Sequence, residues 1–290
     1  MMENQKLTPK SFARKIKLFV SAFVSRVRSH LVKAFSLISK PDKINIGSGR
    51  RAWMGWICLD ELTYPSVTKL SFTPSVNFPV RSNSISLAYN SHNLEHLTDE
   101  IVDRILVEVK RCLKSGGLFV VKIPDFDFFI EQYRLGNSSA MSNKGCESII
   151  WSWKNYGVED TFENRTAMMF SGYWNNSYGD HFSGQIHQTN PSAYHGPPVI
   201  EKSRMASILT ELDIRNISKT LNQSILEDKE FKAFNHCNAW SKHDLENLLI
   251  SHGFEILKMD KQEVKNRFKH QIPDLQSMFD WSMIVVASKP

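Results

Sequence analysis

The sequence predicts an α/β fold built on a mostly parallel sheet, and three observations lead to it. From residue 43 onward, short apolar runs alternate with amphipathic helical patterns, as in strand, helix, strand units. The run KINIGSG passes from a buried-strand pattern directly into glycines. With 41% hydrophobic and 23% charged residues over 290 positions, the chain can bury the core of one or two domains.

The first half of the predicted sheet is well marked. Strands are expected at KINI, at WICLD, which ends in Asp60, and at SISLAYN, which alternates with period two. A helix follows, with Thr98 placed to cap its first turn, Lys110 and Arg111 suited to its last turn, and Ser-Gly-Gly at 115–117 ending it. Its expected buried face is Ile101, Ile105, Leu106, Val109 and Leu113. LFVVKIP is the next buried strand, and this order predicts parallel pairing through a right-handed crossover.

The C-terminal part predicts one more helix and two more strands. Ser241 is expected to begin a capping box with Asp244, and Gly253 to end the helix. The side chains expected to be buried are Leu245, Leu248, Leu249 and Ile250. FEILKMD and WSMIVVASK are the two strands. Between Asp127 and Ala239 the periodicity is weak and Trp, Tyr, Asn, His and Gly are frequent, so we interpret this part as an insertion.

The N-terminal segment carries the basic charge of the chain. Residues 1–40 hold nine Lys or Arg against one acid, so this segment contributes +8 to a net charge of +6 and leaves −2 for the rest. That balance argues against a nucleic-acid partner. Apolar residues from Phe12 to Ile38 recur at steps of three and four, which predicts an amphipathic helix, while interspersed charges exclude a membrane span. Two alternatives are open for this segment. Its apolar stripe packs on the rest of the chain or on another subunit, or residues 9–40 lie on an anionic membrane surface.

Two features bear on metal binding. The four cysteines are widely spaced without a C-x-x-C pair, so neither a zinc ribbon nor a disulfide framework is predicted, and a reducing cytoplasm is the default. His92 to His96 reads HNLEH, a zinc-peptidase signature that needs both histidines on one helical face. Here the stretch falls between a strand and the cap at Thr98, so we expect no metal site, and His96 is as well explained as a loop residue bonded to backbone.

Gly47-Ser48-Gly49 and Asp60 suggest a nucleotide-type ligand. Glycines after a strand let the backbone approach a ligand, and the acid that closes the next strand suits ribose hydroxyls. GSGRRA also fits G-x-G-x-x-A, but 13 positions separate Gly47 from Asp60, against about 20 in the dinucleotide fingerprint. No full helix fits between them to hold a pyrophosphate. A ligand with adenosine and no pyrophosphate suits this site better, and S-adenosylmethionine is the commonest.

Six segments together resemble class I S-adenosylmethionine-dependent methyltransferases, over roughly residues 43–127 and 237–290: KINIGSG, GWICLD, SISLAYNSHNLEHL, VKRCLKSGGLFVVKIPD, HGFEILKMD and WSMIVVASK. The resemblance implies a Rossmann-like methyltransferase sheet, mostly parallel with an antiparallel C-terminal strand. The expected fold adds an N-terminal amphipathic helix and a large insertion after the fifth strand. The Gly-Trp before the acid of WICLD, the NAWS segment and IPDLQSMFDWS resemble methyltransferases associated with bacterial surface-polysaccharide biosynthesis.

The resemblance implies a set of cofactor-binding residues and a domain organisation. The expected cofactor-binding residues are Gly47, Ser48, Gly49, Asp60, Asn90, Ser91, His92 and Glu95. The expected domains are a basic helical segment at 1–40, the methyltransferase domain at 41–127 and 237–290, and an acceptor-binding insertion at 128–236. Two departures stand out. No Asp or Glu occurs from 62 to 94, where the family places an acid near the adenine, and the crossover at 50–54 is too short for a helix.

The function expected from these features is S-adenosyl-L-methionine-dependent O-methylation of a sugar or other small or glycan acceptor in cell-surface polysaccharide metabolism. The protein is expected in the cytoplasm, peripheral on the inner face of the membrane, with its oligomeric state open. A hydroxyl acceptor favours a general base, and the candidates are His181, His187, His195 and Asp125. Two alternatives stay open: a methyltransferase-like binding or regulatory protein without turnover, and a zinc hydrolase that rests on HNLEH alone.

Overall fold

The computed structural model describes most of the predicted sheet and part of the insertion. The described residues are 41–49, 51–141, 159–171, 200–223, 236–277 and 281–290. The expected N-terminal helix and the three insertion histidines lie outside them. No helix among the described residues is both long enough and apolar enough to cross a membrane.

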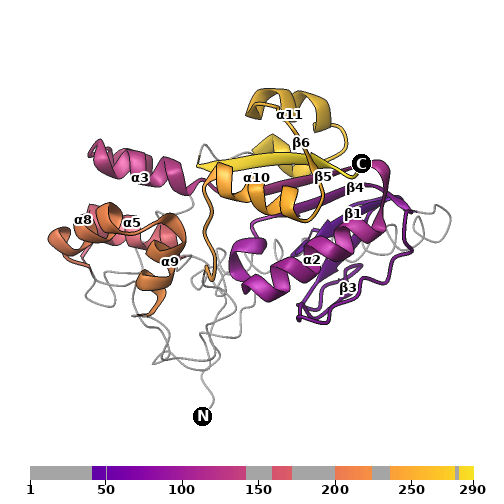
Figure 1. Ribbon diagram of the computed structural model, residues 1–290, viewed down its shortest axis with the longest axis horizontal. Coiled ribbons are helices and arrows are strands. Elements are labelled where there is room, and N and C mark those ends of the chain that lie inside the picture. Colours follow the sequence, from indigo (N-terminus) through magenta and orange to yellow (C-terminus); the bar gives the residue numbers. More distant parts are fainter. Residues whose placement is uncertain (1–40, 50, 142–158, 172–199, 224–235, 278–280) are drawn as a thin grey trace, which may run out of the picture.

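A seven-stranded sheet forms the centre of the molecule, in the order β3-β2-β1-β4-β5-β7-β6 (Figure 1). Its strands are β1 (Lys43–Ile46), β2 (Ile57–Asp60), β3 (Thr68–Lys69), β4 (Ile85–Ser91), β5 (Leu113–Pro124), β6 (Glu255–Leu257) and β7 (Ser282–Ser288). The first five pair with one another in parallel, and β7 is antiparallel to both β5 and β6. The predicted mostly parallel sheet with an antiparallel C-terminal strand is confirmed.

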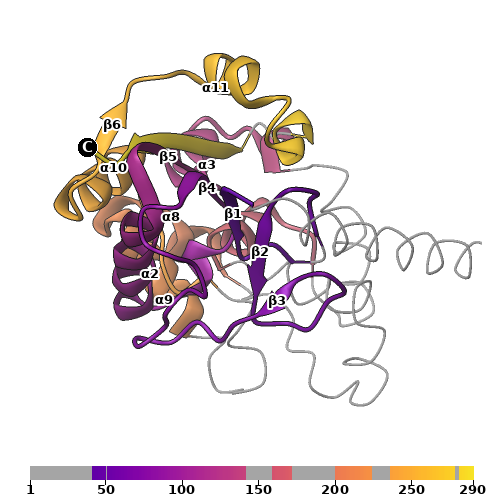
Figure 2. The ribbon, with the colours of Figure 1, turned by 90° about the vertical axis from the view of Figure 1, so that its right-hand side faces the viewer.

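Helices cover both faces of this sheet and form a separate group at one end. The α-helices are α2 (Asp99–Cys112), α3 (Phe126–Arg134), α5 (Phe162–Ser171), α8 (Lys202–Glu211), α9 (Ile214–Gln223), α10 (Lys242–Ser251) and α11 (Lys261–Phe268). The 3-10 helices are η1 (Leu94–His96), η2 (Ser138–Met141) and η6 (Pro273–Ser277). Helices α2 and α10 share one apolar core with the sheet, whereas α11 packs on the opposite face (Figure 2). Helices α3, α5, α8 and α9 bury a core of their own.

The connection from β1 to β2 is short, as the sequence predicted. Its described residues, 47–49 and 51–56, contain a turn and no helix. Trp53 and Trp56 are buried there, and the Trp53 ring stacks on Tyr89 of β4 with 5.5 Å between centroids. Two indole rings therefore cover the sheet face where a crossover helix would otherwise pack.

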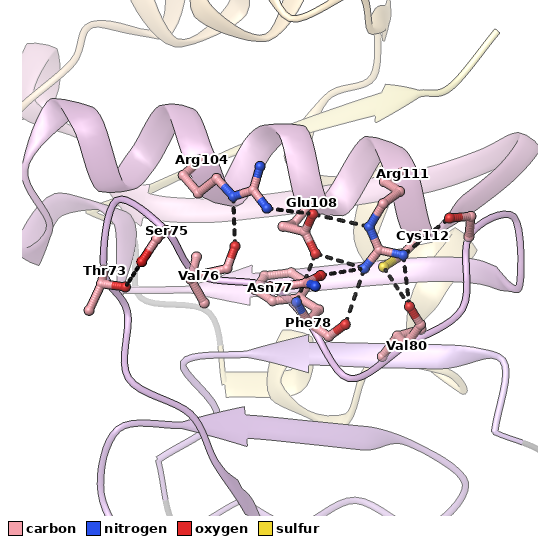
Figure 3. A network of polar contacts seen from close by, with 11 residues as sticks. Thr73, Ser75, Val76, Asn77, Phe78, Val80, Arg104, Glu108, Arg111 and Cys112 are labelled. Atoms are coloured by element: carbon pink, nitrogen blue, oxygen red, sulfur yellow. Dashed lines mark hydrogen bonds and ion pairs between the residues drawn. The ribbon is translucent and has the colours of Figure 1, made fainter.

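The connection from β3 to β4 is held along α2 by a buried ion cluster (Figure 3). The Glu108 carboxylate, 1% exposed, accepts the Phe78 N–H at 2.7 Å and an Arg111 N–H at 2.7 Å. Arg104 Nε donates to the Val76 carbonyl at 2.6 Å, and Arg111 also donates to the Phe78 carbonyl at 3.1 Å. These charge-assisted bonds replace the backbone pairing that a regular element would provide.

Helices α2 and α10 begin after the predicted N-cap residues, but the capping hydrogen bonds differ from those predicted. Thr98 is the N-cap residue of α2, but its side chain makes no capping bond. Ser241 Oγ accepts the Asp244 N–H at 3.0 Å at the start of α10, and the reciprocal bond of a box is lacking there. A full capping box occurs instead in α11, between Asp260 and Glu263.

Two expectations about side chains and turns need correction. Ile250, expected in the core, is 53% exposed, because Leu245 and Leu249 form the buried stripe of α10. Ser-Gly-Gly does not separate helix from strand, since Leu113 already pairs with Ile85 of β4. The next pair is Leu87 with Leu118, so residues 114–117 bulge out of the strand, with Gly116 at φ 72°.

Candidate active site

The carboxyl ends of β1, β2 and β4 meet at one edge of the sheet, because these strands are parallel neighbours. The glycine turn after β1 docks on the end of β2. The backbone N–H groups of Gly47 and Ser48 donate to the Leu59 carbonyl at 2.9 and 3.0 Å. The Gly49 N–H donates to Asp60 Oδ2 at 2.7 Å, so the turn and the acid that the sequence singled out form one unit.

The two glycines of this turn serve different purposes. Both have positive φ, 67° at Gly47 and 55° at Gly49. A Cβ at Gly47 would lie 2.2 Å from Cγ of Asn93, whereas a Cβ at Gly49 would have no described atom within 4 Å. Gly47 is therefore required for packing against the residue that precedes η1. Gly49 borders open space, where a ligand can approach the backbone.

At the end of β4, Asn90 is fully buried beside this turn. Its Nδ2 donates to the Ile46 carbonyl at 3.1 Å, which ties β4 to the last residue of β1. Asn90 Oδ1 and Asn93 Nδ2 are buried and make no hydrogen bond within the described residues. A buried polar atom without a partner costs about 1–3 kcal/mol, so a ligand with polar groups fits this edge.

A carboxylate that the sequence analysis missed organises the neighbouring side chains. Asp274 of η6 is buried and accepts bonds from Tyr89 Oη at 2.8 Å, Ser91 Oγ at 3.0 Å and Lys122 Nζ at 3.3 Å, and it pairs with Arg51. Burial lowers the pKa of Lys122 to about 8, and the Arg51 charge acts in the same direction. The one charged residue inside the apolar run LFVVKIP was the signal for Lys122. In the described structure, Ser91 therefore donates its hydroxyl hydrogen bond to Asp274.

HNLEH lies in the connection from β4 to α2, as predicted, and forms a 3-10 turn rather than an α-helix. His92 has φ 48°, and its ring packs edge-on against Trp281 at 5.4 Å. Its Nδ1 lies 3.2 Å from Glu95 Oε1 and its Nε2 lies 3.0 Å from Ser282 Oγ. Burial lowers the pKa of His92 well below its usual value, so the ring is neutral near pH 7.

Glu95 is fully buried beneath the two histidines of the motif. Burial raises its pKa to about 7, although the nearby His96 acts in the opposite direction. Glu95 Oε1 lies 4.0 Å from His96 Nε2. Glu95 thus titrates near neutral pH at the same edge of the sheet as Asn90.

The segment before α10 closes over this motif. Asn238 donates its backbone N–H to the Glu95 carbonyl at 2.9 Å and its Nδ2 to the Leu97 carbonyl at 2.6 Å. His236 is buried with its ring 4.9 Å from that of His96. Burial, followed by the influence of His96, lowers the pKa of His236. Sequence reasoning missed His236, because nothing in its local pattern marks it; only the adjoining NAWS segment was noted.

Of the four general-base candidates, only Asp125 lies among the described residues. His181, His187 and His195 lie outside the described residues. Asp125 caps α3, where its side chain accepts the Phe128 N–H at 3.1 Å, and its Oδ2 lies 3.8 Å from Lys261 Nζ. These contacts give Asp125 a structural role.

The segment expected near an adenine supplies no carboxylate of its own. Phe72, Val76 and Phe78 of this segment are buried against the sheet. The nearest acid in sequence, Glu61, follows Asp60 directly and accepts the Phe72 N–H at 2.8 Å. Glu61 therefore holds the segment in place through a backbone contact.

Comparisons with known proteins indicate the class of domain to which part of the chain is similar. Residues 66–121 match a family model described as a methyltransferase domain. No curated protein matches the chain. Among solved structures, an S-adenosylmethionine-dependent methyltransferase from Mesorhizobium loti is 14% identical, covers 89% of this chain and 96% of its own, and has a TM-score of 0.35. A possible histamine N-methyltransferase from Thermotoga maritima is 13% identical, with coverages of 96% and 98% and a TM-score of 0.36.

The assignment of a methyltransferase domain rests on the match to the family model and on the geometry of the site. The matched residues run from β3 through β4 and α2 into β5 and include Asn90, Ser91, His92 and Glu95. The open space beside Gly49 and the buried polar atoms of Asn90 and Asn93 fit a bound nucleoside-type ligand. The chain carries a methyltransferase domain, and the cofactor of this domain is S-adenosyl-L-methionine.

Proposed function

We propose that the protein transfers a methyl group from S-adenosyl-L-methionine to a hydroxyl group of a sugar, a glycan or another small acceptor. One observation carries the proposal: buried polar atoms that have no hydrogen-bond partner among the described residues lie at or just after the end of β4 and in the segment before α10. They include Asn90 Oδ1, Asn93 Nδ2, Glu95 Oε2 and Asn238 Oδ1. Polar groups buried in this way suit polar ligands, both the cofactor and an acceptor rich in hydroxyls.

The cofactor-binding proposal keeps six of the eight residues that the sequence singled out. Gly47, Ser48 and Gly49 offer backbone and space, and Asp60 offers a carboxylate to the ribose after the Gly49 N–H is released or shared. Asn90 and Glu95 line the exit of β4. His92 acts by orienting Glu95, because both of its ring nitrogens already have partners.

Methyl transfer needs few catalytic groups on the protein. The sulfonium of S-adenosyl-L-methionine supplies an activated methyl group, so the chain mainly positions the acceptor and excludes water. A hydroxyl must lose its proton as the new bond forms, and His181, His187 and His195 remain the proposed bases. Asp125 ranks behind them, because capping α3 already uses its carboxylate.

The polysaccharide role and the membrane location are the finer parts of the proposal. They rest on the resemblance of GWICLD, NAWS and IPDLQSMFDWS to methyltransferases associated with bacterial surface-polysaccharide biosynthesis. They also rest on the basic, amphipathic pattern of residues 9–40. A methyltransferase-like binding protein without turnover is the second candidate, favoured by the lack of an acid in the adenine segment. The zinc-peptidase interpretation loses its support, since His92 and His96 share no α-helix.

The test combines binding with turnover. Calorimetry with S-adenosylmethionine and S-adenosylhomocysteine is expected to show binding to the full chain. Radiolabelled S-adenosylmethionine is then incubated with the protein and with carbohydrate, lipid or protein fractions of a cell envelope, and labelled sugars are examined for O-methyl groups. Label in the carbohydrate fraction is the expected result. Cofactor binding without label in any fraction would favour the second candidate, and absence of binding would contradict both.

A further inference from the structure

Three metal-ligating side chains meet at the edge of the sheet described above. Among the described residues, Glu95, His96 and His236 each offer a ligand atom, and these atoms all lie within 4.8 Å of one another. We propose that this cluster binds a divalent transition-metal ion, with Zn²⁺ as the first candidate, and that the ion takes the acceptor hydroxyl as a further ligand. The metal site stands on its own geometry; its role toward the acceptor rests on the proposed function.

The fold brings the three ligands together from distant parts of the chain. Glu95 and His96 are neighbours on η1, which directly follows β4. His236 arrives after the insertion, and the two bonds of Asn238 to the carbonyls of Glu95 and Leu97 fix it there. Hydrogen bonds from the backbone and the side chain of Asn238 therefore hold the two sides of the cluster together, which preorganises a metal site.

The hydrogen bond of His236 sets its tautomer. Its Nδ1 lies 3.1 Å from the carbonyl oxygen of Phe170, which can only accept, so Nδ1 carries the proton. The lone pair of the neutral ring is then on Nε2, the ring nitrogen that can ligate an ion. A ligating histidine that donates its other N–H to a backbone carbonyl is the usual arrangement around bound metals.

Glu95 provides the second, independent observation. One of its oxygens, Oε1, is 3.2 Å from His92 Nδ1, while Oε2 is fully buried and has no hydrogen-bond partner among the described residues. Burying an unsatisfied carboxylate oxygen is costly, and a cation bound there would offset that cost. His92 is held by its contact with Ser282 and orients the Glu95 carboxylate without being a ligand itself.

The surrounding charges permit a cation. The charge of the buried Lys122 acts on Glu95, but Lys122 is paired with Asp274, as is Arg51. The Asp274 carboxylate thereby reduces the repulsion that Lys122 would exert on an ion beside Glu95.

The ligand set defines the kind of ion and its use. Two imidazole nitrogens and one carboxylate oxygen suit Zn²⁺ and related divalent ions, and three protein ligands leave a position open. An acceptor hydroxyl in that position would give up its proton to a general base more readily. Its oxygen lone pair then forms the O–C bond to the methyl group as the C–S bond breaks, and the C–S electron pair stays on sulfur, yielding S-adenosylhomocysteine.

The experiment measures metal binding by the full, tag-free chain after removal of metal with a chelator. Calorimetry with Zn²⁺ and visible absorption with Co²⁺ are expected to show one ion per chain. His96→Ala and His236→Ala are each expected to weaken Zn²⁺ binding about a hundredfold. His252→Ala is the matched control, because it removes a histidine that pairs with Asp103 away from the site, and it should leave the affinity unchanged.

Thermal melting and S-adenosylhomocysteine binding on the same samples separate the possible failures. A chain that binds S-adenosylhomocysteine but no Zn²⁺, or equal Zn²⁺ affinity in all three variants, would overturn the metal site. Zn²⁺ binding that depends on His96 and His236 without cofactor binding would support the site and overturn the proposed function. If His236→Ala does not melt cooperatively, His96→Gln decides, because this partly exposed position tolerates a polar replacement.

Discussion

At the scale of single residues, the site depends on how closely the backbone of the β1 turn approaches η1. Gly47 lies against Asn93 so tightly that no side chain fits, and its φ of 67° would strain any other residue. Gly136 has a similar φ of 66° but open space around it. Substitutions at the two glycines therefore distinguish the cost of backbone strain from the cost of steric overlap.

Gly47→Ala is expected to lower the free energy of unfolding by about 3 kcal/mol, because strain and overlap add. Gly136→Ala is expected to cost only about 1 kcal/mol, from strain alone. Urea unfolding of both variants measures the difference. Equal losses would show that Asn93 moves aside and that Gly47 is not needed for packing.

Asp60→Asn is expected to weaken S-adenosylhomocysteine binding at least about tenfold, since a charged acceptor for ribose hydroxyls becomes a weaker neutral one. The amide can accept only one of the two backbone N–H bonds, from Gly49 and Leu62, that the Asp60 carboxylate accepts, so the melting temperature should also fall. Calorimetry measures the affinity. Glu100→Gln, at an exposed position of α2, is the control and should bind as the unaltered protein does. Unchanged affinity in Asp60→Asn would remove Asp60 from the site.

At the scale of elements, two helix starts that look alike in sequence differ in the structure. Ser241 caps α10 through its hydroxyl, whereas the Thr98 hydroxyl makes no capping bond in α2. Ser241→Ala is expected to cost about 1 kcal/mol and Thr98→Ala close to nothing. Chemical denaturation of the two variants checks this. A larger loss at Thr98 would contradict the described geometry.

Glu108 holds the connection from β3 to β4, so Glu108→Gln is expected to cost about 2 kcal/mol of stability at pH 7. Burial alone would raise the pKa of Glu108, but its bonds from Arg111 and Phe78 outweigh burial and lower that pKa below 4.5. Its stabilisation is therefore present above pH 4.5 and is lost as pH falls through the folded value. Denaturation from pH 7 to pH 3 should show a steeper loss in the unaltered protein than in the variant. Parallel curves would contradict the lowered pKa.

Elements were more predictable than contacts. The strands and α2 follow from local periodicity, so KINI, SISLAYN and the helix after Thr98 could be placed from the sequence. The glycine turn and Asp60 could also be found, because a strand end and its next residues are local features. Asp274 and His236 could not, since each reaches the site only through pairings between segments far apart in the chain.

At the scale of the whole molecule, the basic N-terminal segment is the feature with the clearest consequence. The full chain is expected to float with vesicles containing anionic lipid, while a chain starting at Pro41 is expected to stay in solution. Flotation at low and high salt measures this, and S-adenosylhomocysteine binding by both proteins controls for folding. Equal behaviour of the two proteins would leave packing against the rest of the molecule as the role of residues 9–40.

The place of β7 has a consequence for synthesis. It follows every other described element along the chain, yet it lies between β5 and β6 in the sheet. Ser282, its first residue, also contacts His92. A growing chain on the ribosome therefore exposes the apolar edge of β5 until residue 288 has emerged, and contacts this distant in sequence form slowly. We expect the nascent protein to depend on chaperones that shield strand edges.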